Sequence, residues 1–175
     1  MRYTVEMSSS IDPGRLRPSR LWRRLSDERR LAAARAFWAD TESGKEQLQA
    51  VNAIAQQKKF RPRTVLALPD DRKARYLASM PMLSEPLAAR ALVSYHLEAQ
   101  RPMMAAFLDA LGIAHDGGAI TDEQLQAPDA AALAAAVRTL ASSYPREDVA
   151  LYLSTLLCQD PLVWAGLAEL PELDG

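Results

Sequence analysis

The chain has one cysteine, Cys158, among its 175 residues, so no intrachain disulfide can form. A single cysteine suits a reducing compartment, because small secreted domains usually depend on several disulfides. Valine and isoleucine together number only 11, whereas alanine (31) and leucine (25) dominate. Since Ala and Leu favour helices and β-branched residues favour strands, this composition argues against a β-rich fold.

Long hydrophobic runs are also missing. No segment approaches the roughly 20 apolar residues that cross a bilayer, so we expect no membrane span. Residues 1–18 contain no apolar stretch of the kind found in secretory signals. These features favour a cytoplasmic location. A chain of 175 residues is expected to form one domain with a hydrophobic core of its own.

The sequence contains no signature of an enzyme or of a metal site. Its only two histidines are His96 and His115, and no pair of His or Cys residues has metal-ligand spacing. The pair Gly117-Gly118 lacks the Lys-Ser/Thr of a phosphate-binding loop. We therefore expect no metal and no cofactor, and a role in binding rather than catalysis.

Helical spacing of apolar residues runs through most of the chain. Caps, prolines and glycines divide it into about seven to eight antiparallel helices, which predicts an all-α bundle or a short array of helix pairs. Residues 1–18 are expected to form an irregular tail, 19–170 the helical domain and 171–175 a short acidic tail. Residues 112–127 form the longest predicted loop. One or two turns of amphipathic helix are expected over residues 19–25, and the longer predicted helices cover residues 27–40, 45–59, 69–79, 86–99, 103–111, 129–143, 146–158 and 161–169.

One internal similarity bears on the choice between bundle and array. Residues 25–30 (Leu-Ser-Asp-Glu-Arg-Arg) resemble residues 68–73 (Leu-Pro-Asp-Asp-Arg-Lys), 43 positions later. A period of about 40–47 residues is typical of stacked helix pairs. Acidic residues followed by basic ones also simply stabilise the start of a helix. The sequence leaves both interpretations open.

Charge is distributed unevenly along the chain. Residues 1–75 hold 17 Lys and Arg against 9 Asp and Glu, whereas residues 76–175 hold 4 against 13. The net charge of −1 therefore hides a basic half and an acidic half. Either the basic half binds something anionic, or the two halves neutralise each other within one fold or between subunits.

The basic half supplies the main candidate site. Arginine suits bidentate contacts with carboxylates and phosphates. We expect a protein-interaction or self-associating module, with nucleic-acid or other polyanion binding as the alternative. The isoelectric point of about 6.1 argues against a dedicated nucleic-acid-binding domain. The candidate residues are Arg20, Arg23, Arg24, Arg29, Lys58, Lys59, Arg61 and Arg63.

A third hypothesis places a polar pocket among the helices. His96 lies beside the apolar stripe of the predicted helix 86–99, and His115 and Asp116 lie in the long loop. A histidine beside a carboxylate can act as an acid, a base or a ligand. This hypothesis requires His96, His115 and Asp116 to converge on one cavity. Cys158 is expected at the buried end of a helix, which disfavours a nucleophilic role.

Overall fold

The computed structural model describes residues 16–174, and most of these residues are helical. The all-α prediction is confirmed, whereas most of the predicted tail at 1–18 lies outside the described residues. No helix in the described part of the chain is long and apolar enough to cross a membrane. The α-helices of residues 16–174 are α1 (Pro18–Arg24), α2 (Asp27–Ala39), α3 (Gly44–Lys58), α4 (Pro62–Leu66), α5 (Asp70–Ala78), α6 (Glu85–Ala99), α7 (Arg101–Ala110), α8 (Ala130–Ser143) and α9 (Arg146–Gln159).

Helix boundaries follow the local chemistry that the sequence indicated. The Ser26 side chain accepts a hydrogen bond from the Arg29 N–H at the start of α2, and the Asp129 carboxylate accepts one from Ala132 at the start of α8. Such caps satisfy N–H groups that have no partner within the helix. Prolines stand in the first turns of α1, α4, α6 and α7, where no such N–H is lost. Local sequence therefore sets most of the boundaries.

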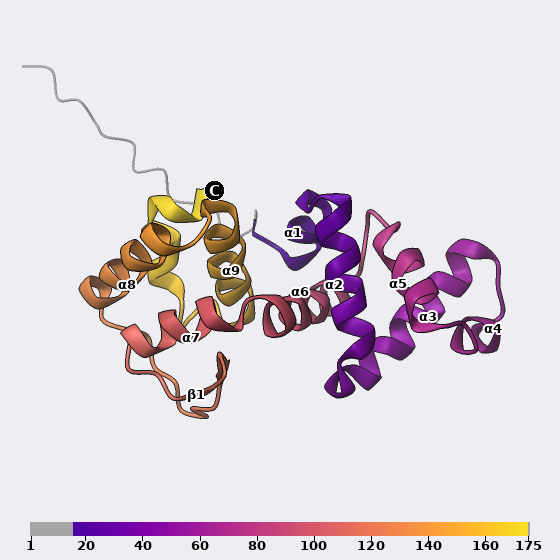
Figure 1. Ribbon diagram of the computed structural model, residues 1–175, viewed down its shortest axis with the longest axis horizontal. Helices are drawn as coiled ribbons and strands as arrows, with labels where there is room; N and C mark the ends of the chain where they lie inside the picture. The colour runs from indigo at the N-terminus through magenta and orange to yellow at the C-terminus, as the bar shows by residue number, and fades with distance from the viewer. Residues whose placement is uncertain (1–15, 175) are drawn as a thin grey trace, which may run out of the picture.

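Two hydrophobic cores lie along the long axis of the molecule (Figure 1). Residues 16–99, with α1 to α6, form the amino-terminal lobe, whose core centres on Trp22, Phe37 and Ile54. Residues 100–174 form the carboxy-terminal lobe, whose core centres on Phe107 and Trp164. Helix α6 runs between the two groups of helices (Figure 1). It contacts α1, α2 and α3 on one side and α7 and α9 on the other.

The two similar segments at 25–30 and 68–73 begin helices α2 and α5. In each, the first acidic residue pairs with a basic residue three positions later: Asp27 with Arg30 at 2.8 Å, and Asp70 with Lys73 at 2.9 Å. Helices α2 and α5 also pack against each other. The shared pattern thus works as a charged helix start in both places.

The long loop contains a small hairpin that the sequence analysis did not predict. Strand β1 (His115–Asp116) pairs antiparallel with β2 (Ala119–Ile120). The turn residues Gly117 and Gly118 have φ of 52° and 92°, a region that favours glycine. A Cβ on Gly118 would lie 2.6 Å from the Cβ of Met104, so only glycine lets the hairpin lie this close to α7.

Two predictions about the core and the last helix are wrong. Helical spacing in the predicted helix 45–59 places Leu48 on the inward face together with Val51 and Ala55, but the Leu48 side chain is 58% exposed. The segment predicted as a helix over 161–169 is a turn followed by the short 3₁₀ helix η3 (Ala165–Glu169). The Asp160 carboxylate accepts a hydrogen bond from the Val163 N–H, which favours a turn. This path, continued by the 3₁₀ helix η4 (Pro171–Asp174), buries Trp164, Leu167 and Leu173 in one core.

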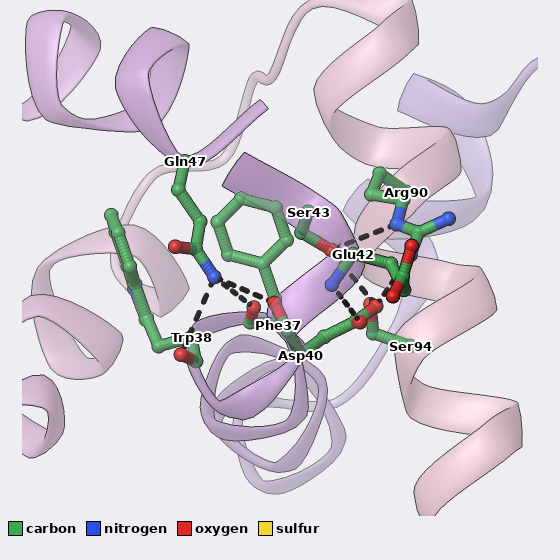
Figure 2. Close-up of polar contacts among 8 residues, drawn as sticks. All are labelled: Phe37, Trp38, Asp40, Glu42, Ser43, Gln47, Arg90 and Ser94. Atoms are coloured by element: carbon green, nitrogen blue, oxygen red, sulfur yellow. Dashed lines mark hydrogen bonds and ion pairs between the residues drawn. The ribbon is translucent and has the colours of Figure 1, made fainter. Parts of the chain in front are cut away.

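A cluster around Asp40 joins the end of α2 to α6 (Figure 2). Its carboxylate accepts hydrogen bonds from Arg90 Nη2 at 2.8 Å, Ser94 Oγ at 2.7 Å, Ser43 Oγ at 2.8 Å and the Glu42 N–H at 2.9 Å. Burial alone would raise the pKa of Asp40, but these hydrogen bonds and the Arg90 charge lower it below its usual value. The carboxylate is therefore ionised and fully partnered, as a structural group should be.

Gln47 completes the connection between α2 and α3. Its amide nitrogen donates to the carbonyls of Phe37, Trp38 and Asp40 at 2.9, 3.3 and 3.0 Å (Figure 2). The last carbonyls of a helix have no partner within it, so this side chain satisfies the carboxy-terminal end of α2.

We predict that Asp40→Asn lowers the free energy of unfolding by about 2 kcal/mol, because it leaves Arg90 without its counter-ion and removes a charged acceptor. Urea denaturation monitored by circular dichroism measures this change. Asp71→Asn is the matched control, because Asp71 also accepts hydrogen bonds from arginines, Arg35 and Arg75, but is half exposed. Exposed ion pairs contribute little. Equal losses in the two variants would contradict a structural role for the Asp40 cluster.

Candidate functional site

Helix α1 exposes three of the eight candidate basic residues. Leu21 and Trp22 are buried, so Arg20, Arg23 and Arg24 lie on the solvent side of this amphipathic helix. None of these three has a carboxylate oxygen within 4.0 Å when residues 16–174 are considered. Their charge thus faces solvent, without a partner from the described chain.

Four more candidates, Lys58, Lys59, Arg61 and Arg63, surround the turn between α3 and α4; we call them the basic tip. Lys58 ends α3, and Lys59 adopts a left-handed conformation with φ of 57° that reverses the chain. The Phe60 N–H then donates to the Ala55 carbonyl at 2.9 Å, which closes the end of the helix. All four basic side chains are exposed, and no carboxylate of residues 16–174 lies within ion-pair distance of them.

Apolar groups lie next to the basic tip. Phe60 is 39% exposed, and its ring meets Tyr76 of α5 edge-on, with centroids 6.1 Å apart. The Lys58 ammonium lies 5.1 Å from the centre of the Tyr76 ring, a cation–π contact. Leu66 of α4 is 53% exposed. The surface therefore offers both positive charge and apolar area to a partner.

Arg29 differs from the other seven candidates because it has a partner. Its Nη2 lies 2.8 Å from Asp148 Oδ1 and 3.5 Å from Glu147 Oε2, both at the start of α9. Arg24 and Arg29 also line an open cleft of about 430 Å³, where α1 and α2 meet α9. Glu147 lines the same cleft, so an acidic ligand there would meet a carboxylate as well as the two arginines.

The charge asymmetry of the sequence persists in the folded molecule. Residues 16–99 carry 16 Lys and Arg against 9 Asp and Glu, and residues 100–174 carry 3 against 11. Within residues 16–174, Arg29 is the one Lys or Arg that forms an ion pair between the two lobes. All other ion pairs of Lys and Arg in this range join two residues of the amino-terminal lobe. Helix α4 and helix α8 lie toward opposite ends of the long axis (Figure 1). The molecule is therefore strongly dipolar.

His115 and Asp116 do not converge with His96. The His115 ring lies 2.8 Å from Asp109 Oδ1 through Nε2, and its Nδ1 accepts a hydrogen bond from the Gly118 N–H at 3.0 Å. These bonds hold the hairpin to the end of α7. The Asp116 side chain is exposed at the hairpin. The described residues contain no group of three or more His, Cys, Asp or Glu side chains arranged to hold a metal.

His96 instead shares a cavity of about 200 Å³ with Tyr152 of α9. The Gly118, Ala119 and Ile120 segment of the hairpin lines this cavity, whereas His115 and Asp116 do not. His96 is only 2% exposed, and its Nδ1 lies 2.8 Å from the Leu92 carbonyl. A carbonyl only accepts hydrogen bonds, so Nδ1 carries the proton of the neutral ring and Nε2 is an acceptor. Neither His96 Nε2 nor the Tyr152 hydroxyl has a hydrogen-bond partner among the described residues.

Burial dominates the electrostatics of this cavity. It lowers the pKa of His96 to about 4, although the hydrogen bond to Leu92 and the charge of Asp148 act in the opposite direction. Burial also raises the pKa of Tyr152 well above its ordinary value. Both side chains are therefore neutral near pH 7.

Cys158 is no better suited to nucleophilic chemistry than the sequence indicated. Burial, with a smaller contribution from the Glu85 charge, raises the pKa of its thiol to about 11. The thiol points to the Leu16 carbonyl at a distance of 3.6 Å. Because the thiolate is the reactive form, this cysteine is protonated and unreactive near neutral pH.

Tyr152 is the functional candidate that the sequence analysis missed. Its position on the apolar face of helix 146–158 indicated a core residue, and it is indeed buried. The lack of a partner for its hydroxyl depends on how α6, α9 and the hairpin pack together, which the sequence does not indicate. The one sequence signal was a polar-tipped residue that shares a helix face with Val149 and Leu156.

Comparison with known proteins adds no assignment: no family model, no curated protein and no solved structure matches this chain. The function is therefore inferred from the charged surface and the cavity.

We predict that acid destabilises the protein partly through His96. A folded-state pKa below the unfolded value of 6.5 means that the unfolded chain binds the proton more tightly, so stability falls as the pH falls toward 4. Between about pH 7.5 and about pH 5 the loss should be about 2 kcal/mol. The rings of Tyr95 and Tyr152 pack against the His96 ring, and the charge of Asp148 raises the pKa of His96 against the effect of burial.

Urea denaturation of the wild type and of His96→Gln at both pH values measures this loss. Titration of the other groups is common to both proteins and cancels in the comparison. The substitution should remove this part of the acid sensitivity. An unchanged pH dependence in His96→Gln would show that the histidine does not titrate in this range.

Proposed function

We propose that this protein is a non-catalytic interaction module whose basic amino-terminal lobe binds an acidic protein surface. The observation that carries the proposal is that seven of the eight candidate basic residues have no carboxylate partner within residues 16–174. Had the two lobes neutralised each other, the asymmetry would be purely architectural. Instead, Arg29 alone of the eight is paired across the lobes.

The basic tip is the part of this surface best equipped for a partner. Its four cations steer an acidic partner and set its orientation, which raises the association rate more than the affinity. Phe60 and Leu66 beside it supply exposed apolar area, which contributes affinity when water is excluded. Arg20, Arg23 and Arg24 belong to the same lobe, but α1 packs against α6 and α9 and lies away from the basic tip (Figure 1).

A second copy of the chain offers the required acidic surface. Its carboxy-terminal lobe carries 11 acidic against 3 basic residues and lies away from the basic tip along the long axis (Figure 1). A contact between the basic tip of one molecule and the acidic lobe of another joins two different surfaces. Such heterologous contacts continue from copy to copy unless geometry closes a ring. We therefore propose a head-to-tail mode of self-association.

We predict that sedimentation velocity at tens of micromolar protein reveals association at about 20 mM salt and dissociation at about 500 mM salt, where the Debye length falls to a few ångströms. The double substitution Lys58→Glu with Lys59→Glu should weaken association by tenfold or more, because it reverses the charge of the tip.

The matched control makes the same change of net charge on the acidic lobe. Arg138→Glu with Arg146→Glu adds the same negative charge to exposed sites of α8 and α9. This control should leave association unchanged or strengthen it. A monomer at both salt concentrations, or equal weakening by the two double variants, would contradict the head-to-tail contact.

A second candidate function is polyanion binding, favoured by the concentration of Lys58, Lys59, Arg61 and Arg63 around the exposed ring of Phe60. Cations with an adjacent aromatic ring are typical of surfaces that bind single-stranded nucleic acid. The acidic lobe opposes this function, since it repels a long polyanion that extends beyond the tip.

We predict that, if this second function operates, a fluorescent single-stranded oligonucleotide binds at low salt and that log Kd rises linearly with log salt concentration. Fluorescence anisotropy measures both properties. The variant with Glu at Lys58 and Lys59 should lose binding, whereas the Arg138 and Arg146 control should retain it. No binding at about 20 mM salt would exclude this function.

A further inference from the structure

We propose that the open cleft where α1 and α2 meet α9 binds a free α-amino acid with an apolar side chain. Arg24 and Arg29 hold its carboxylate, and Glu147 holds its ammonium group. This inference goes beyond the interaction function proposed above. The cleft lies beside α1 and α9, away from the basic tip, and its ligand is a small molecule (Figure 1).

Charges of both signs line this cleft, and together they select the class of ligand. Its basic members are Arg24 and Arg29, and its acidic member is Glu147. A simple anion would meet the Glu147 carboxylate, and a simple cation would meet two guanidinium groups, so each would be opposed by a like charge. A molecule that carries one charge of each sign has a favourable partner for both of them.

The spacing of the charged groups favours an α-amino acid among such molecules. The carboxylate and the ammonium group of an α-amino acid are attached to the same carbon, so their protein partners must lie side by side. Arg29 Nη2 and Glu147 Oε2 lie 3.5 Å apart, which allows one ligand to contact both. The termini of a peptide belong to different residues, so a peptide does not present its two charges in this way.

The charged side chains of the cleft have capacity left for a ligand. Arg24 has no carboxylate oxygen within 4.0 Å when residues 16–174 are considered. Arg29 Nη2 donates to Asp148 Oδ1 at 2.8 Å, but a guanidinium has five N–H groups, and this bond occupies one of them. Because arginine binds carboxylates through paired hydrogen bonds, the two arginines fit the carboxylate of the ligand.

A ligand can reach these polar groups from solvent. Arg24 and Glu147 are exposed, and Arg29 is half-buried. The buried side-chain atoms that lack a partner within residues 16–174 belong instead to four residues outside the cleft: Arg30, Trp38, His96 and Tyr152. The cleft therefore differs from the cavity beside His96, whose unpartnered atoms are closed off.

Apolar side chains form the deeper part of the cleft and receive the side chain of the ligand. Four buried leucines line it, contributed by the segments of α1, α9 and η4: Leu21, Leu25, Leu151 and Leu173. The cleft measures about 430 Å³, whereas a cavity of about 150 Å³ holds benzene. A branched or aromatic side chain fits this space together with the charged end of the molecule. L-Leucine is therefore a suitable probe.

Titration calorimetry on the full-length protein tests the proposal with three ligands that differ only in charge. L-Leucine carries both charged groups, 4-methylpentanoate lacks the ammonium group, and 3-methylbutylamine lacks the carboxylate. We expect L-leucine to bind at least tenfold more tightly than either analogue, because each analogue loses one charged contact and meets a like charge.

Two variants test the assigned roles. Arg24→Gln should weaken L-leucine binding about tenfold and reduce its advantage over 3-methylbutylamine, and Glu147→Gln should weaken it about tenfold and reduce its advantage over 4-methylpentanoate. Arg23→Gln and Glu169→Gln make the same changes of charge at exposed residues outside the cleft, and they should leave all three affinities unchanged. Circular dichroism verifies that each variant is folded.

Three results would overturn the proposal. Equal affinities for L-leucine and 4-methylpentanoate would show that Glu147 does not recognise the ammonium group. Equal weakening by the cleft variants and their controls would place the binding elsewhere. No saturable binding of L-leucine up to about 10 mM would show that the cleft takes no such ligand. None of these results bears on association through Lys58 and Lys59, so the two proposals fail separately.

Discussion

Helix α6 is the element on which the rest of the structure depends, because it takes part in both halves of the molecule. Leu87, Ala88, Ala91 and Leu92 lie in the amino-terminal core, and the Asp40 cluster attaches Arg90 and Ser94 to the end of α2. The last turn brings His96 and Leu97 against α9 and the hairpin. A single rigid helix shared in this way fixes the two lobes along one axis. The separation of charge and the cavity both follow from that arrangement.

Four of the nine acidic residues of the amino-terminal lobe form ion pairs within that lobe. Asp27 and Asp70 stabilise the first turns of α2 and α5, Asp71 pairs with Arg35 and Arg75, and Asp40 pairs with Arg90. Asp27, Asp70 and Asp71 lie in the first turns of their helices, where negative charge is favourable, and Asp40 caps the short helix that follows α2. The cations of α1 and of the basic tip are left without a described partner. Pairing within the lobe therefore accounts for these four carboxylates, but not for the lobe's excess of positive charge.

Much of the fold could be predicted from the sequence because its determinants are local. Ser26, Asp129 and the helix-opening prolines act within a few residues of where they stand, and the helices begin there. Gly112, whose φ is 66°, likewise follows the end of α7. The last predicted helix was wrong: the chain there forms a turn, in which the Asp160 carboxylate accepts from the Val163 N–H, and then two 3₁₀ helices, and Trp164, Leu167 and Leu173 pack in one core along this path. Leu48 was misplaced because helical spacing alone does not identify which side of α3 has a neighbour.

The candidate site was predictable only in part, for the same reason. Exposure of the basic residues on α1 follows from its amphipathic pattern, and that of the basic tip from its position at a turn. The partner of Arg29 lies 119 positions away at Asp148, and no local rule indicates it. His96 was singled out because it is one of two histidines. Its grouping with Tyr152 depends on how α6 meets α9, which is a property of tertiary packing.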